Sequence, residues 1–312
     1  MRFSRHLLLA PLLLAGSLGA AWAAPLPVVA TFSILGDLAH QVGGDHVQVT
    51  TLVGADGDAH VYQPTPQDIR RVAQAKVLLS NGLGFEGWLD RLGDSAGFKG
   101  ERIVASQGIH AQSMQEEEEG HGHDDHALAA HDGHGHSITD PHAWNNPANV
   151  LIYIDNIAKG LSQADPANAA DYQANAARYK QQLTSAAAAF TARFAALPAE
   201  RRIAITSHDA FGYLAQAFHL TLLSPQGLST DAEPSAAQVA QLIRQIRQQK
   251  APALFVENIS DPRLMEQIAR ETGTRIGGKL YSDALSGPQG DAPTYLAMMQ
   301  HNLSTLLKAL EP

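Results

Sequence analysis

Four side chains that could bind a metal ion lie in short polar segments far apart in the chain. His60 lies in GDAHVYQP, His142 in DPHAW, His208 in SHDAF and Asp283 in YSDAL. Three imidazoles and one carboxylate would fill a tetrahedral zinc site with ligand distances of about 2.0–2.2 Å. Spacing alone does not single these residues out, because an isolated histidine is more often a surface or core residue than a ligand. Whether they meet depends on the elements that carry them.

A second group of histidines lies between 116 and 136, where the sequence reads EEEEGHGHDDHALAAHDGHGH. This composition cannot build a core, and imidazole is the commonest protein ligand for zinc, copper and nickel. We expect a flexible segment that binds metal weakly, since ordering it would cost roughly 1–2 kcal/mol of backbone entropy per residue. The alternative is an acidic linker whose histidines are incidental. The histidines are His121, His123, His126, His131, His134 and His136.

The first half of the chain alternates short apolar runs with amphipathic stretches. Such alternation predicts an α/β domain with a mostly parallel sheet. The expected strands are 28–32, 47–53, 77–80 and 103–105, and the expected helices are 33–42, 65–75, 85–92 and 149–163. A long loop, 113–139, interrupts the alternation, and loops of that length are usually functional or disordered.

A long helix is expected at 165–197. Asp165 is a plausible cap, Pro166 suits the first helical position, and no glycine occurs from there to Leu197. Pro198 marks the end of the helix. About 30 residues at 1.5 Å each would extend roughly 45 Å, which is enough to cross the whole molecule and to limit hinge motion.

The alternation resumes after this helix, and the chain is therefore predicted to form two lobes, 24–164 and 198–312. Ligands of α/β sheets bind outside the carboxyl ends of the strands, so a cleft between the lobes is the expected site. His60, His208 and Asp283 each follow a predicted strand. The expected strands of the second lobe are 203–206, 220–223, 253–257 and 279–282, and its helices are 211–218, 235–249, 262–272 and 294–310.

Residues 1–23 have the layout of a cleaved secretory signal. Arg2 and Arg5 precede an apolar run, and Ala21-Trp22-Ala23 forms the cleavage site. The alternative, an uncleaved anchor, is disfavoured because the run is shorter than the ~20 residues that span a bilayer. The chain has no cysteine, so neither disulfides nor a lipidated cysteine are expected. We expect a free periplasmic protein.

The net charge of −9 argues against nucleic acid as a partner, because nucleic-acid-binding surfaces are basic. It also favours the long-range attraction of cations. A zinc hydrolase is the catalytic alternative, and it would need an open coordination position and a general base. The sequence contains no H-E-x-x-H, G-x-S-x-G or P-loop pattern. A binding protein without catalysis is therefore expected.

Several segments in the same order resemble the metal-specific solute-binding proteins of ABC importers, the zinc- and manganese-binding group. The resemblance covers nearly the whole chain after residue 23, and it implies two α/β lobes bridged by a long helix with the metal between them. It also implies that the ligands are His60, His142, His208 and Asp283. The segments are GDAHVYQP, NGLGFEGWL, DPHAW, SHDAFGYLA, EPSAAQVAQLI, LFVENISDPR, ETGT and LYSDALS.

The third ligand position bears on the choice of metal. Manganese-binding members of this group resemble the chain but carry glutamate where His208 stands, and nitrogen ligands suit zinc better than manganese. The acidic, His-rich segment also resembles that of zinc-binding members. We expect three residues to orient the ligands, with a helix cap or surface charge as the alternative for each. They are Asp140, Asp209 and Glu257.

The resemblance implies a monomer that captures Zn²⁺ in the periplasm and delivers it to an ABC permease in the inner membrane. A periplasmic zinc metallochaperone is a second expected partner. Two alternatives stay open, a periplasmic zinc chaperone or buffer without its own transporter, and a manganese-binding importer component.

Overall fold

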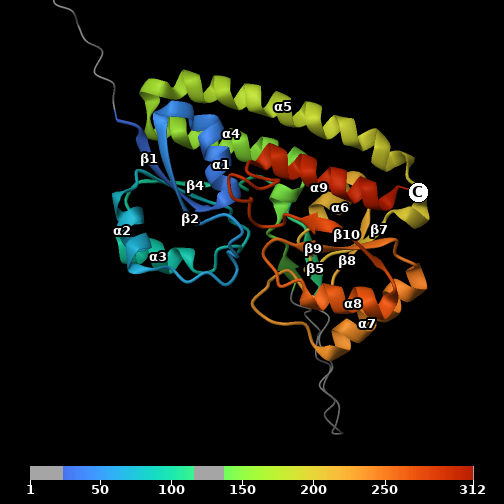
Figure 1. Cartoon of the computed structure of the whole chain (residues 1–312). Helices are drawn as coiled ribbons and strands as arrows, with labels where there is room; N and C mark the ends of the chain where they lie inside the picture. The colour runs from blue at the N-terminus through green and yellow to red at the C-terminus, as the bar shows by residue number, and fades with distance from the viewer. Residues whose placement is uncertain (1–23, 116–136, 312) are drawn as a thin grey trace, which may run out of the picture.

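Two four-stranded parallel sheets and one long helix dominate the computed structural model (Figure 1). The structure describes residues 24–115 and 137–311. The strand orders are β2-β1-β3-β4 in the first sheet and β10-β9-β7-β8 in the second. The predicted signal segment, 1–23, and the His-rich segment, 116–136, lie outside the described residues.

The N-terminal sheet is covered on both faces, as parallel sheets require. In Figure 1, helices α2 and α3 lie on the opposite side of this sheet from α1 and α4. All four residues of β3 are buried, which explains why this strand is a continuous apolar run. The elements are β1 (Leu26–Phe32), α1 (Ser33–Gly43), β2 (Val47–Val53), α2 (Pro66–Gln74), β3 (Val77–Ser80), α3 (Leu89–Ala96), β4 (Glu101–Val104) and α4 (Pro147–Ala164).

The helix predicted at 85–92 was misplaced, because α3 begins only at Leu89. The chain before it makes a tight turn with positive φ at Gly82 (85°), Leu83 (56°) and Gly84 (81°). The buried carboxylate of Glu86 stabilises this turn by accepting the backbone N–H groups of Asn81 and Gly82. Residues that satisfy the backbone in this way compete with the helix.

The C-terminal sheet is also parallel throughout. Its last strand was predicted at 279–282 but begins earlier, at Arg275, with an irregular register around Gly277 and Gly278. These glycines weaken the strand pattern in the sequence, and a Cβ at Gly277 would lie 2.6 Å from the Phe255 ring. The elements are β7 (Ile203–Ile205), α6 (Gly212–Phe218), β8 (Thr221–Leu223), α7 (Ala236–Gln249), β9 (Ala253–Glu257), α8 (Arg263–Thr272), β10 (Arg275–Leu280) and α9 (Tyr295–Leu310).

Helix α5 (Ala169–Ala196) runs along both lobes (Figure 1). A short 3₁₀ turn, Pro166–Asn168, precedes it, and its 28 residues extend about 42 Å. It packs against α1 and α4 of the first lobe and against α6 and α9 of the second. Most of the buried side chains of both lobes form one continuous core, and a smaller core lies under α7 and α8.

A small antiparallel hairpin, β5 (Ser113–Gln115) and β6 (Ser137–Thr139), was not predicted. Each strand has only three residues, which is too short for a periodic pattern to show in the sequence. The two strands pair the residues that flank the segment 116–136. The strand β6 leads directly into the turn that carries His142.

Candidate metal centre

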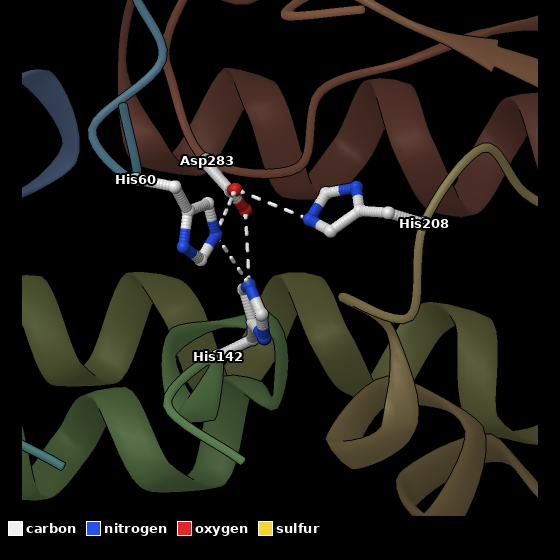
Figure 2. Close-up of side chains that lie close together, drawn as sticks. All are labelled: His60, His142, His208 and Asp283. Carbon is white, nitrogen blue, oxygen red and sulfur yellow. Dashed lines mark hydrogen bonds and ion pairs between the residues drawn. The ribbon is translucent and has the colours of Figure 1, made fainter. Parts of the chain in front are cut away.

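The side chains of the four predicted ligand residues point toward one another (Figure 2). One ligand atom from each lies within 4.8 Å of the others. The Nε2 atoms of His60 and His208 each lie 3.2 Å from Asp283 Oδ2, and His142 Nε2 lies 3.7 Å from Asp283 Oδ1. The lobes contribute two residues each. His60, His208 and Asp283 follow the sheet strands β2, β7 and β10, and His142 follows the short strand β6. Four segments that are far apart in the sequence thus meet at one point.

Three atoms at this point lack a hydrogen-bond partner among the described residues: His208 Nε2 and both carboxylate oxygens of Asp283. Asp283 is fully buried. A buried carboxylate without hydrogen bonds is unfavourable unless a cation compensates it. Three imidazole nitrogens and a carboxylate suit a divalent transition metal, so the residues fit a bound metal ion.

Two buried carboxylates contact the Nδ1 atoms of the ligands His142 and His208. Asp140 Oδ1 lies 2.8 Å from His142 Nδ1, and Glu257 Oε2 lies 2.6 Å from His208 Nδ1. Each carboxylate also accepts the backbone N–H of its own histidine, at 2.9 and 3.0 Å respectively. Holding Nδ1 fixes the ring and directs Nε2 toward the metal position. The contacts expected of Asp140 and Glu257 are therefore present.

Asp209 does not fulfil the same expectation. Within the described residues its side chain makes no hydrogen bond to a ligand histidine, and its backbone N–H donates to Gly227 O at 3.1 Å. Burial and the nearby charge of Asp140 raise the pKa of its carboxyl. The structure thus brings it near the site without a contact that would orient a ligand.

The charges of the site are strongly coupled. Burial acts to raise the pKa of Asp283, but the neighbouring His208 and His142 outweigh it and hold that pKa well below its usual value. Burial acts to lower the pKa of His208, but Glu257 and Asp283 outweigh it and raise that pKa well above its usual value. A metal ion binds the deprotonated imidazole, so metal binding at His208 competes with proton binding.

His60 is held differently from the other ligands. His142, His208 and Asp283 are fully buried, whereas the side chain of His60 is 6% exposed. It lines a surface cavity of about 630 Å³ together with Phe85, against which its ring packs edge-on at 4.8 Å. His60 is therefore the ligand that faces the solvent.

A buried polar network that the sequence analysis missed supports the His142 turn. Glu86 accepts the Thr31 hydroxyl at 2.6 Å and the Asn81 N–H at 2.6 Å. Asn81 Nδ2 then donates to the carbonyl of Pro141 at 2.9 Å. The polar residues of the otherwise apolar segment NGLGFEGWL were the available signal, but their partners lie 55 to 60 residues away in sequence.

The loop that carries Asp283 is hydrogen-bonded to the N-terminal lobe. Trp144 Nε1 donates to Ser282 O at 2.8 Å, and Leu285 N donates to Ser33 Oγ at 2.9 Å. The Asp283 carboxylate therefore stays at the interface even though it follows a strand of the C-terminal sheet.

This fold and site define a metal-binding solute-binding protein with two α/β lobes. Residues 28–309 match the family described as "zinc-uptake complex component A periplasmic", and the chain belongs to this family. It is 33% identical over 281 residues to the iron-binding protein YfeA of Yersinia pestis, covering 90% of this chain and 85% of that one. It is 28% identical to the manganese ABC transporter substrate-binding lipoprotein PsaA of Streptococcus pneumoniae, covering 91% and 89%.

Solved structures agree with this assignment. The Mn-bound periplasmic metal-binding protein from Candidatus Liberibacter asiaticus superposes with a TM-score of 0.78 at 32% identity, covering 91% of this chain and 98% of that one. The periplasmic zinc-binding protein TroA of Treponema pallidum superposes with a TM-score of 0.82 at 27% identity, covering 93% and 100%.

The chain is therefore a metal-binding component of an ABC importer, a class that works with a membrane permease, and it is not an enzyme. The names of its relatives include iron, manganese and zinc. Some relatives, PsaA among them, are named lipoproteins. Among the described residues, no helix combines the length and apolar character needed to cross a membrane.

Proposed function

We propose that this protein captures Zn²⁺ in the periplasm and delivers it to an ABC permease. The observation that carries the proposal is the convergence of three imidazole nitrogens and the Asp283 carboxylate on one buried point. We assign His60, His142, His208 and Asp283 as the ligands. With four protein ligands the site can be tetrahedral, as zinc prefers, without an open position for catalysis.

The balance of nitrogen over oxygen ligands favours zinc. Nitrogen ligands suit zinc, while manganese prefers carboxylate, carbonyl and water oxygens. Glu257 keeps His208 in the orientation that presents Nε2. The second candidate is manganese, and a specific observation favours it: both oxygens of Asp283 are without partners among the described residues, so this carboxylate could bind bidentately and raise the coordination number. Names of relatives that include manganese support the same candidate.

A competition titration of the mature protein against chelators distinguishes the two metals. We expect one tight Zn²⁺ site and much weaker Mn²⁺ binding. The variant Asp283→Asn should lose tight binding, whereas Asp261→Asn, which changes an exposed carboxylate on the same lobe, should not. Tighter binding of Mn²⁺ than of Zn²⁺ would show that the zinc assignment is wrong.

We also propose that the protein is a free periplasmic monomer. The chain contains no cysteine that a lipid could modify, unlike relatives that are named lipoproteins. The alternatives are a zinc chaperone or buffer without its own transporter. Zinc uptake can be compared in cells that lack this protein and in cells that lack its permease. An importer component should give the same uptake defect in both strains, whereas a chaperone or buffer should not.

A further inference from the structure

The carboxylate of Asp58 joins the backbone of His60 to the opposite lobe. Its Oδ1 atom accepts the His60 N–H at 2.9 Å, and its Oδ2 atom accepts the Thr230 hydroxyl at 2.6 Å. Asp58 and His60 lie in the loop 54–65 between β2 and α2, and Thr230 lies in the loop 224–235 between β8 and α7. One side chain therefore fastens the ligand-bearing loop of one lobe to a loop of the other.

The loop 224–235 is in turn attached to the segment that carries His208. Gln226 forms an isolated parallel bridge with His208, and the Asp209 N–H donates to Gly227 O. A chain of contacts thus runs from His208 through this loop to Thr230, and from Thr230 through Asp58 to His60. It connects a ligand of each lobe without passing through the metal.

The two loops joined by the hydrogen bond between Asp58 and Thr230 line two surface cavities. Asp58 and Thr230 line a cavity of about 490 Å³. Nearby residues of the same two loops, His60 and Ser229, line the cavity of about 630 Å³ over the metal site. Separation of the two loops would widen the opening above His60, the ligand that already faces the solvent.

Other contacts hold the loop 54–65 when this bond is absent. The Asp56 N–H donates to Leu285 O at 2.9 Å, and Trp88 Nε1 donates to Ala59 O at 3.0 Å. The loss of the Thr230 hydroxyl would therefore leave the loop folded and remove its fastening beside His60.

We propose that Thr230 is a positioning residue that acts through Asp58 to keep His60 on the bound metal and so slows metal release. The inference rests on the proposed function, since it assumes that the four residues bind Zn²⁺. A hydrogen bond to a charged acceptor is stronger than a neutral one, so its loss should speed Zn²⁺ dissociation by about tenfold. Association should also become faster, because the opening is wider, so the equilibrium affinity should change less than the dissociation rate.

The test is stopped-flow dissociation of Zn²⁺ from the full mature protein into excess chelator. We expect Thr230→Val to release Zn²⁺ about tenfold faster than the unchanged protein. Thr230→Ser, which keeps the hydroxyl, should restore slow release. Thr191→Val on the exposed face of α5 is the matched control and should leave the rate unchanged. Equal rates for Thr230→Val and the unchanged protein, or fast release from Thr230→Ser, would overturn the inference.

A double-mutant cycle tests whether Thr230 acts through Asp58. In an Asp58→Ala background, Thr230→Val should have no further effect on the dissociation rate. A full additional acceleration there would overturn the proposed route, even if Thr230→Val alone behaves as expected. If the unchanged protein has no tight Zn²⁺ site, the proposed function is wrong. The comparison among the Thr230 variants tests only the role of Thr230. Circular dichroism of each variant confirms that the fold is kept.

Discussion

At the scale of single residues, the site separates the groups that face the metal from the groups that hold them. The ligands His142 and His208 each turn Nδ1 toward a buried carboxylate, while His60 relies on its backbone and on the Phe85 ring. Substitutions of the residues that contact the ligands should therefore lower metal affinity by unequal amounts. The loss should be largest where a carboxylate is paired with a fully buried imidazole.

Glu257→Gln tests this pairing. The amide keeps the shape of the side chain but removes the negative charge that raises the pKa of His208. Loss of such a partner typically weakens metal binding by about 10- to 100-fold, and we expect this range in a chelator competition with Zn²⁺. Glu266→Gln, on the exposed face of α8, should bind as tightly as the unchanged protein. Unaltered affinity in Glu257→Gln would show that His208 is positioned by other contacts.

At the residue scale the sequence could identify the ligands only through the resemblance of whole segments, because their spacing is uninformative. The expected partners Asp140 and Glu257 contact the ligands, whereas Asp209 does not. The network of Glu86 and Asn81 could not be predicted, since hydrogen bonds between residues more than 50 positions apart depend on the completed fold.

At the scale of elements, strands were easier to place than turns. The predicted bounds of β3 and β9 agree with the structure because buried parallel strands are continuous apolar runs. The bounds of β2 also agree, because its β-branched residues favour a strand. The errors at α3 and β10 both involve glycine. Turns with positive φ and close packing of the backbone depend on tertiary contacts. Such features leave little periodic pattern in the sequence.

The start of α2 gives a prediction about pH. Thr65 and Asp68 form a capping box, and Asp68 also accepts hydrogen bonds from Tyr62 and Arg71. Burial acts to raise the pKa of Asp68, but these hydrogen bonds outweigh it and the pKa is lowered. A carboxyl whose pKa is lower in the folded protein stabilises it above the unfolded-state pKa, and this stability is lost as pH falls through the folded-state pKa.

Asp68→Asn should therefore reduce the free energy of unfolding by about 1 kcal/mol at pH 7 and by less below pH ~4. Urea unfolding of the metal-free protein at both pH values measures the difference. Asp45→Asn, in the 3₁₀ turn after α1, serves as the control. A penalty of the same size at both pH values would mean that the charge of Asp68 does not stabilise the fold.

At the scale of the whole molecule, the continuous core and α5 restrict how far the lobes can separate. Small-angle scattering of the metal-free and Zn²⁺-loaded protein should give nearly equal radii of gyration, because release requires movement of loops rather than a wide hinge opening. Scattering curves that differ grossly between the two forms would contradict this prediction. The protein without the segment 116–136 serves as the control for any change that arises outside the described residues.

The same deletion tests the His-rich segment. Removal of 116–136 should leave one tight Zn²⁺ site and lower the number of weakly bound Zn²⁺ ions, as measured by competition titration and equilibrium dialysis. A variant in which the six histidines of this segment are replaced by serine should behave in the same way. If either change abolishes tight binding, the assignment of His60, His142, His208 and Asp283 is incomplete.

The position of α9 has a consequence for the order in which the chain acquires its structure. This last helix contributes Leu303, Leu306 and Leu310 to the same core as β1, and the Tyr295 N–H donates to Asp37 of α1. Helix α1 therefore completes its packing only after α9 has been synthesised. Such long sequence separation between contacting elements slows folding, so the N-terminal lobe stays incompletely packed until α9 is available.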